Sequence, residues 1–211
     1  TSLSFTTTDV SSPSLSSASP ADNATAVAVD SNIVLTFSEA VDVESGNILI
    51  KKSSDNSTVE SIDVTSSQVT GSGTTQITIT PSSDLASGTQ YYVQIPTTAF
   101  DNAAGNSYAG ITDTTSLSFT TNINTGNAVF TISGNLQVGE SLSIAETSPD
   151  PDGTGILSYI WQSSLNKNTW ANIGTNSSYI LSTSNKNKFI RAIVSYRDKK
   201  GFSESVSTDS V

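Results

Sequence analysis

The chain has 211 residues, with 19 acidic and 9 basic side chains and a net charge of −10. This length fits two domains better than one, and the acidic balance argues against binding to nucleic acid or to an anionic membrane surface. The sequence contains no Cys, Met or His. Catalysis by a serine or cysteine with histidine, thiol redox chemistry, and zinc sites made of imidazole or thiolate are therefore excluded, which leaves oxygen ligands.

The composition predicts an all-β protein. Ser and Thr are abundant, Gly and Asn mark many turns, and β-branched residues recur in short alternating runs with no helical periodicity. The sequence has no apolar run of the length that a membrane helix requires, and its first residues do not follow a signal-peptide pattern. We therefore expect no membrane insertion by this part of the protein.

The first seven residues, Thr1–Thr7, have the same sequence as Thr115–Thr121. Leu117 and Phe119 alternate with polar residues in the second copy, as in a half-buried strand. The spacing of the two copies corresponds to one β-sandwich of ~100 residues. We interpret residues 1–13 as the end strand of a preceding repeat plus a linker, and Thr115–Thr121 as the closing strand of the next domain.

Short alternating runs predict the strands of a first domain over residues 14–122. An edge strand is expected at 15–20 and a core strand at 32–38, with Ile33, Leu35 and Phe37 facing inward. The remaining expected core positions follow in chain order: Ile48, Ile50, Val59, Ile62, Val64, Val69, Ile77, Ile79, Tyr91, Val93 and Ile95. Residues 100–110 read as a loop.

The first domain resembles the bacterial Ig-like domain of S-layer and giant surface proteins. The resemblance rests on spaced motifs that occur in the same order: 19–23, 29–33, 37–41, 88–93 and 100–106. It implies a β-sandwich in a secreted protein with many repeats, used as a spacer or stalk. It does not imply an enzyme.

A change in charge marks the boundary to a second domain over residues 123–211. Residues 1–122 carry twelve acids but only Lys51 and Lys52, whereas the remainder carries seven acids and seven bases. Strands are expected at 129–134, 138–144, 157–162, 170–173, 179–181, 189–196 and 201–206. The boundary itself is a short polar linker.

The second domain resembles another Ig-like repeat of giant bacterial and cyanobacterial surface proteins. The matching pieces are 132–134, 138–139, 152–154, 159–164, 170–173 and 190–201. Trp161 looks like the core tryptophan of an Ig strand, and Phe189 occupies the position expected for a corner tyrosine. Together the two resemblances imply an all-β fold of two tandem Ig-like antiparallel β-sandwiches.

Carboxylates close together on turns are candidate calcium ligands, and no other cofactor is expected. Asp150 and Asp152 lie two apart on an acidic turn and could converge on one ion, although a plain acidic turn explains them too. Asp101 and Asn106 flank a loop that could hold a cation or serve only as a turn. Asp9 is a calcium candidate through the resemblance alone, because related arrays often stiffen their linkers with calcium.

The function favoured by the sequence is a non-catalytic stalk or spacer segment of a large extracellular or cell-surface protein. Its expected partners are the neighbouring repeats of the same chain, while other domains of the parent protein would bind a cell-surface glycan or protein. The alternative is a carbohydrate-binding module of a secreted polysaccharide-active protein. That function requires exposed aromatic rings in a row, for which Trp170, Tyr179 and Tyr196 are available.

Overall fold

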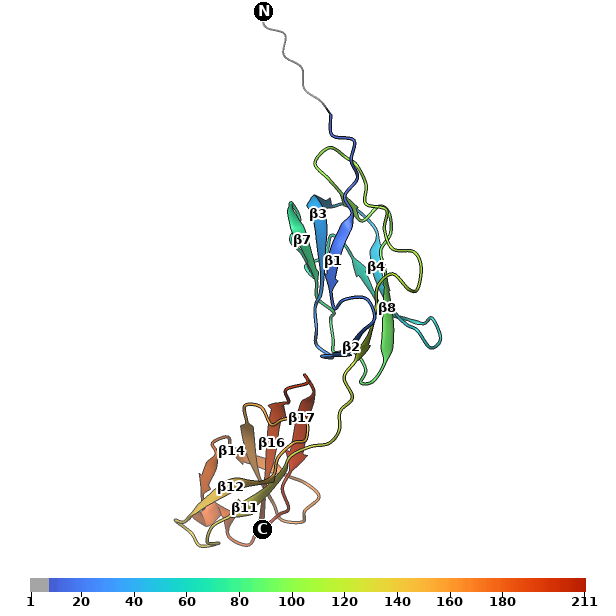
Figure 1. The fold of residues 1–211 in the computed structure, drawn as a ribbon. Coiled ribbons are helices and arrows are strands. Elements are labelled where there is room, and N and C mark those ends of the chain that lie inside the picture. The colour runs from blue at the N-terminus through green and yellow to red at the C-terminus, as the bar shows by residue number, and fades with distance from the viewer. Residues whose placement is uncertain (1–7) are drawn as a thin grey trace, which may run out of the picture. The chain divides into compact units, whose positions relative to one another are not determined.

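A computed structural model describes residues 8–211, which form two compact units divided between Ile123 and Asn124 (Figure 1). The division falls one residue after the boundary expected from the change in charge. The predicted end strand of a preceding repeat lies mostly in residues 1–7, outside the described residues, and stays a prediction. The all-β fold class is confirmed, since strands and the turns between them make up nearly all of both units.

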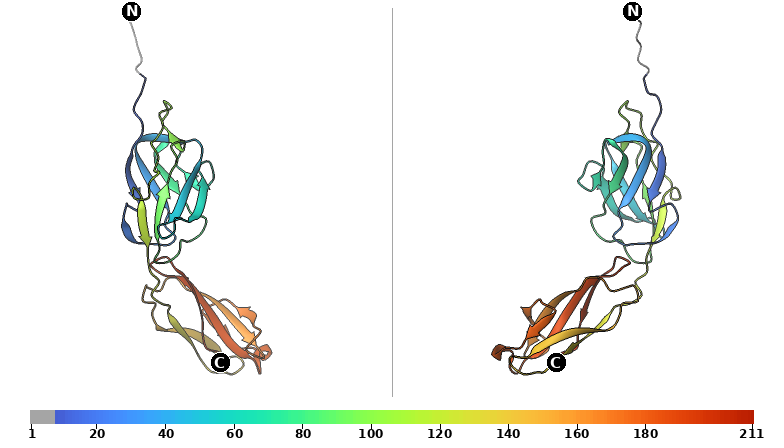
Figure 2. Two further views of the ribbon diagram at one scale, coloured as in Figure 1. Left: turned by 90° about the vertical axis from the view of Figure 1, so that its right-hand side faces the viewer. Right: turned by 60° about the vertical axis from the view of Figure 1, so that its left-hand side comes forward.

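The first unit is a sandwich of two sheets (Figure 2). One sheet has the order β1 (Leu15–Ser19), β3 (Ile33–Val43), β7 (Thr74–Ile79), β6 (Val69–Thr70), with β9 (Phe100–Asp101) paired to the end of β3. The other has the order β2 (Ala24–Val27), β10 (Ser118–Thr121), β8 (Gln90–Gln94), β4 (Asn47–Lys52), β5 (Thr58–Asp63). The predicted loop at 100–110 thus begins with a short strand.

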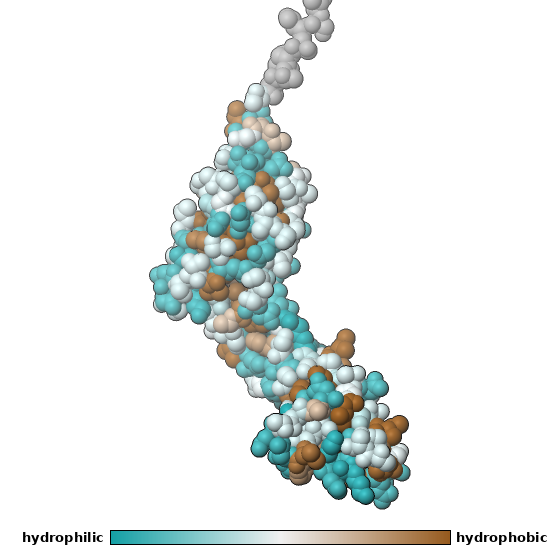
Figure 3. All heavy atoms as spheres, turned by 180° about the vertical axis from the view of Figure 1, so that it is seen from behind, coloured by the Kyte–Doolittle hydropathy of each residue, from teal (hydrophilic) through white to brown (hydrophobic). Residues whose placement is uncertain are grey.

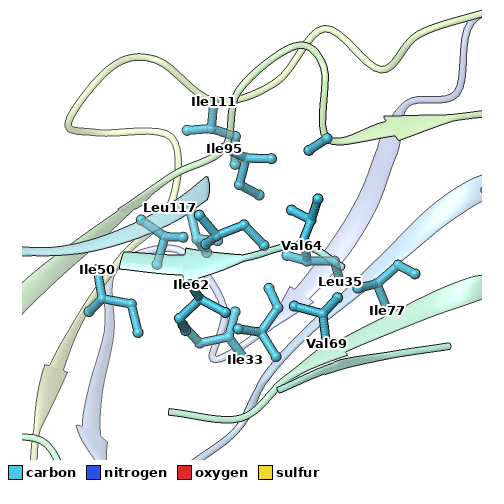
Figure 4. Packing of buried hydrophobic residues seen from close by; sticks show 14 of the residues in the cluster. Ile33, Leu35, Ile50, Ile62, Val64, Val69, Ile77, Ile95, Ile111 and Leu117 are labelled. Carbon is cyan, nitrogen blue, oxygen red and sulfur yellow. The ribbon is translucent and has the colours of Figure 1, made fainter. Parts of the chain in front are cut away.

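Alternating apolar residues from both sheets fill the space between them. In β3, Ile33, Leu35 and Phe37 are at most 3% exposed, while the residues between them are more open. Figure 4 shows how side chains of this core from the two sheets pack against one another. Val59 is an exception among the predicted core positions, because β5 turns it outward and leaves it 44% exposed.

The expectation of purely antiparallel sheets is wrong at one pairing. β2 runs parallel to the closing strand β10, with Ala24 opposite Phe119 and Val27 opposite Thr121. After β1 the chain passes from the first sheet to the second, so β2 continues along the free edge of β10 in the same direction. The other ladders of the first unit are antiparallel.

The second copy of the repeated heptad contains the closing strand, as predicted, although only Ser118–Thr121 of the expected seven residues are strand. Its Leu117 and Phe119 are buried in the core of the first unit. Ser118, expected on the solvent face, is buried as well. The reason is Asp22, whose Oδ1 accepts hydrogen bonds from the Ser118 N–H at 2.9 Å and from its hydroxyl at 3.1 Å.

The second unit also consists of two sheets. The three-stranded sheet has the order β11 (Val129–Ser133), β12 (Ser141–Ser148), β15 (Ser178–Ile180), and the four-stranded sheet has the order β14 (Ala171–Gly174), β13 (Ser158–Ser164), β16 (Phe189–Arg197), β17 (Ser203–Ser207). A single 3-10 turn, Thr183–Asn185, is the helical element of residues 8–211. No helix in this range has the length and hydropathy needed to cross a membrane.

Trp161 is the centre of the second core, as predicted. It is fully buried, its Nε1 donates to the Asn176 carbonyl at 2.8 Å, and Tyr179 packs against its ring. Phe189 is 37% exposed and lies under the Lys167 ammonium group, 4.3 Å from the ring centroid. The predicted strand at 138–144 begins later, because Val138 and Gly139 belong to the turn that precedes β12.

Candidate metal centre

The turn between β12 and β13 carries the two carboxylates of the predicted calcium site. Asp150 Oδ1 accepts a hydrogen bond from the Asp152 N–H at 2.6 Å, and the Asp150 carbonyl accepts from the Gly153 N–H at 2.9 Å. These bonds close the turn. Asp150 and Asp152 are 4% and 6% exposed, so the acidic turn is folded into the unit and does not project into solvent.

The turn between β16 and β17 lies against the first turn. Its Asp198 Oδ1 accepts hydrogen bonds from the N–H groups of Lys200 at 2.9 Å and Phe202 at 2.8 Å. The Lys199 N–H donates to the Gly153 carbonyl at 3.1 Å, which joins the two turns. Asp198 is 6% exposed, although it lies at a strand end.

The segment that leads into β11 forms the third side of the same region. The Asn124 side-chain amide donates to Glu204 Oε1 at 2.6 Å. The Thr125 N–H donates to Asp152 Oδ2 at 2.7 Å, and the Thr125 hydroxyl donates to Oδ1 of the same carboxylate. The start of the second unit is therefore bound by side chains of a distant turn and of β17.

Three carboxylates converge where these segments meet: Asp150, Asp198 and Glu204. One oxygen from each lies within 4.8 Å of an oxygen of the other two, and all three residues are buried. Glu204 reaches this position because β17 alternates, with Ser203 and Ser205 facing solvent and Glu204 facing inward. Hard cations such as calcium bind sets of oxygen ligands of this kind.

Tyr196 links the carboxylates to the segment before β11. Its hydroxyl donates to Asp150 Oδ2 at 2.8 Å and accepts from the Ala128 N–H at 2.7 Å. Burial raises the pKa of Tyr196 to about 12, and the nearby charges of Asp150 and Glu204 act in the same direction. A corner tyrosine at position 189 would make a hydrogen bond between its hydroxyl and the backbone, which Phe189 cannot make. Tyr196 makes a hydroxyl-to-backbone bond from a different position, with the Ala128 N–H.

The predicted pairing of Asp150 with Asp152 on one ion does not match the contacts. Asp152 Oδ1 lies 2.7 Å from the Lys200 ammonium group, and both of its oxygens accept from Thr125. The Lys200 and Thr125 contacts lower the pKa of Asp152 to about 2. Asp152 therefore holds the turn and the linker together, while Asp198 and Glu204 take the place beside Asp150 that the prediction gave to Asp152.

Sequence reasoning missed Asp198 and Glu204 as partners of Asp150. A local signal existed for Glu204, since an acid at an inward position of an alternating strand requires a buried partner. The signal for Asp198 is weaker, because an acid between a core strand and a glycine, here Gly201, is common in ordinary turns. Neither signal identifies Asp150 as the neighbour, because the contact depends on how distant turns pack.

The calcium candidates of the first unit lie partly together. The Asn106 side-chain amide donates to the Asp9 carbonyl at 3.1 Å. The buried Asn102 is at the centre: its amide nitrogen lies 3.0 Å from Glu39 Oε2 and 3.3 Å from Asp9 Oδ2. An amide nitrogen is a donor and no metal ligand, so this arrangement fastens the incoming chain to the loop.

Asp101, the residue before Asn102, takes no part in those hydrogen bonds. It forms part of β9, where it pairs with Asp42 of β3. The hydroxyl and N–H of Ser11 satisfy Asp9 Oδ1 and lower the pKa of that carboxyl. Among residues 8–211, the group in which three acidic side chains converge is the one in the second unit.

The aromatic residues considered for carbohydrate binding do not form an exposed row. Tyr196 is buried, and Tyr179 packs on Trp161 in the core. The Arg191 guanidinium group lies over the Trp170 ring, 4.1 Å from its centroid. Each of these three rings already has a partner within the unit, so together they do not supply the exposed row that the alternative function requires.

The match to a known protein family lies in the first unit. The profile described as "Bacterial Ig-like domain" matches residues 9–121. A search of curated proteins finds no match.

Among solved structures, domains 1–6 of the surface layer protein SbsC are 16% identical with a TM-score of 0.38, covering 95% of this chain and 26% of that one. Titin domains A168–A170 are 14% identical with a TM-score of 0.32, covering 90% and 61%. The chicken CNTN1 FN1–FN3 domains are 11% identical with a TM-score of 0.31, covering 93% and 64%.

The chain spans less than two thirds of the length of each of these structures. At such identities and scores the likeness carries no argument about function. The match to the family profile is different, because it covers more than half of the residues and includes every strand of the first sandwich. The chain belongs to the bacterial Ig-like domain family.

Proposed function

We propose that the chain is a non-catalytic spacer segment in the stalk of a large extracellular bacterial repeat protein. The observation that carries this proposal is the position of the chain ends within each unit. In the first unit, Asp9 enters beside Asn102, and Asn122 leaves beside Val27 and Gly88 (Figures 1 and 2). The entry and the exit lie at opposite ends of the sandwich.

In the second unit, too, the chain enters and leaves at opposite ends, as its contacts with the two ends of β16 indicate. The incoming segment contacts Tyr196 near the end of this strand, whereas Val211 exchanges backbone hydrogen bonds with Ile190 at its beginning. A strand of this length spans about 30 Å. A sandwich that the chain enters at one end and leaves at the other adds its own length to a tandem array, as a spacer requires.

The surface supports a solvated, extracellular role. The net charge of −10 favours solubility, and apolar residues on the face shown in Figure 3 lie in small separate groups. The partners in this proposal are the neighbouring repeats of the same chain, and binding of a glycan or protein at the cell surface belongs to other domains. Calcium at the acidic positions would reduce repulsion between charged repeats.

Two experiments on the source bacterium test the proposal. Antibodies raised against the purified chain should label intact cells, and labelling only after the cells are opened would contradict an extracellular location. Replacing the segment in its parent protein with an unrelated pair of β-sandwiches should preserve the parent's activity. Loss of activity on replacement by a pair of the same length would show that this segment does more than separate other domains.

A further inference from the structure

We propose that Asp150, Asp198 and Glu204 bind a divalent cation of the calcium class in the second unit. This inference goes beyond the spacer function and does not depend on it. The three residues are 4%, 6% and 8% exposed, and each contributes a carboxylate oxygen within 4.8 Å of the other two. Two ligands of one calcium ion, each at about 2.4 Å, can lie up to about 4.8 Å apart.

The decisive observation is an oxygen of Asp198 that lacks a partner. Oδ1 accepts from two backbone N–H groups, which fixes the orientation of the carboxylate. Oδ2 is buried and makes no hydrogen bond. Leaving a buried carboxylate oxygen unsatisfied is costly, and such groups are rare in folded proteins. A cation at Oδ2 would supply the missing interaction.

The other two carboxylates are held in place by hydrogen bonds that leave oxygen lone pairs for a cation. Asp150 accepts one hydrogen bond at each oxygen, from the Asp152 N–H and the Tyr196 hydroxyl, and each of these oxygens keeps a second lone pair. Asn124 occupies Glu204 Oε1, which leaves Oε2 for a ligand. Tyr196 donates to Asp150 Oδ2, and hydrogen bonds of this type orient carboxylate ligands in metal sites. The arrangement is therefore oriented before an ion arrives.

The ligand chemistry selects the ion. All three side chains are hard oxygen donors, and the chain has no Cys or His with which to favour zinc or copper. Calcium accepts irregular sets of six to eight oxygens, whereas magnesium requires a near-ideal octahedron at shorter distances. Three carboxylates from two turns and a strand suit calcium, with water completing the coordination.

Binding would connect the Asp150 turn to the β16–β17 hairpin. The segment leading into β11 would be tied to the same centre through Asn124 and Tyr196. The ion should therefore stabilise the folded second unit by binding it and not the unfolded chain.

The test is a thermal melt of the full chain in excess calcium chloride and in EDTA, followed by tryptophan fluorescence. Both tryptophans, Trp161 and Trp170, belong to the second unit, so this signal is specific to it. We expect calcium to raise the Tm of this transition by several degrees, and magnesium at the same concentration to raise it less. Identical melts in calcium and EDTA, or an equal effect of magnesium, would overturn the proposal.

Two variants separate metal binding from a structural role of the same side chains. Asp198→Asn and Glu204→Gln should abolish the calcium-dependent shift while leaving the Tm in EDTA unchanged or higher, since each removes a charge from a crowded buried cluster. Asp209→Asn and Glu140→Gln change the charge of exposed acids in the same unit and should retain the full shift. A variant that lowers the Tm equally in calcium and in EDTA would mark its residue as structural only.

Discussion

Asp113 shapes the turn that leads into the closing strand of the first unit. Its Oδ1 accepts from the N–H groups of Thr115 and Ser116 at 2.7 Å, and its Oδ2 accepts from the Ser116 hydroxyl at 2.7 Å. These bonds, with the Ser116 hydroxyl contributing most, hold the pKa of the carboxyl well below its usual value of 3.8. The carboxylate is exposed, so solvent weakens the effect on stability.

The lowered pKa predicts a pH-dependent effect of Asp113→Asn. A group whose pKa is lower in the folded state stabilises the fold above its unfolded pKa, and this contribution is lost as the pH falls through the folded pKa. The Tm difference between the wild type and Asp113→Asn should therefore be constant near neutrality and shrink below pH 3.8. Melts in EDTA across this range, followed by circular dichroism, measure it.

The exposed Glu44→Gln serves as a control with the same change of charge. If its Tm difference has the same size and the same pH dependence, the contribution of Asp113 is only its charge and not its hydrogen bonds.

At the residue scale, the sequence identifies the residue types of the carboxylate cluster better than their partners. It points to Asp150 because acids two apart on a turn can share an ion. Its neighbour Asp152 pairs with Lys200 instead, and that contact depends on the β16–β17 turn packing against the acidic turn. Local spacing cannot reveal such a contact, because it contains no information about which distant turn lies alongside.

Among the elements of the first unit, the pairing of β2 with β10 depends on Asp22, which lies just before β2 and accepts hydrogen bonds from Ser118 of β10. Asp22→Ala would leave the buried Ser118 N–H without its acceptor and the Ser118 hydroxyl with only Asn23 Oδ1, at 3.3 Å. The loss of charged hydrogen bonds to a buried residue should lower the free energy of unfolding by about 1–2 kcal/mol. Urea denaturation of the variant measures this loss.

Glu44→Ala removes an exposed acid from the same unit and should change the free energy of unfolding by less than about 0.5 kcal/mol. Equal effects of Asp22→Ala and Glu44→Ala would show that the Ser118 contact contributes nothing.

The approach to β13 in the second unit requires a glycine at position 155. A Cβ built there would lie 1.8 Å from the Arg197 carbonyl oxygen, so the segment must move away from β16 to accept one. Gly155→Ala should destabilise the second unit by about 2 kcal/mol or more, through displaced backbone. The fluorescence melt reports the change.

Gly139→Ala is the matched substitution, at a position where a Cβ meets nothing within 4 Å but φ is +95°. It should cost about 1–2 kcal/mol from backbone conformation alone, because an L-residue with a side chain is strained at positive φ. A Gly155→Ala variant no less stable than Gly139→Ala would contradict the close approach to Arg197.

Element positions were predictable where alternation is strong and apolar. The inward faces of β3 and β7 follow directly from Ile33 and Ile77 and their alternating neighbours. The parallel edge β2 was not predicted as such, because Ala24–Val27 is short and only weakly apolar, and its partner is determined by the chain crossing between the sheets. The strand predicted to begin at Val138 is wrong at its start for the opposite reason, because Val138 is apolar but belongs to a turn.

At the scale of the whole molecule, the chain consists of two sandwiches that each bury their own core. The first core comes from residues before Ile123 and the second from residues after Asn124, with no shared member. In each unit the chain enters and leaves at opposite ends. Under tension, force would therefore be transmitted through each sandwich from end to end, and each should yield separately.

Single-molecule force spectroscopy of the chain, held by its two ends between marker domains, tests this account most directly. We predict two separate unfolding steps that release roughly 35 nm and roughly 30 nm of chain. We also predict a higher force for the second unit in calcium than in EDTA. A single step that releases the whole chain, or extension without a resolvable force peak, would contradict the assignment of the protein as a mechanical spacer of two independent domains.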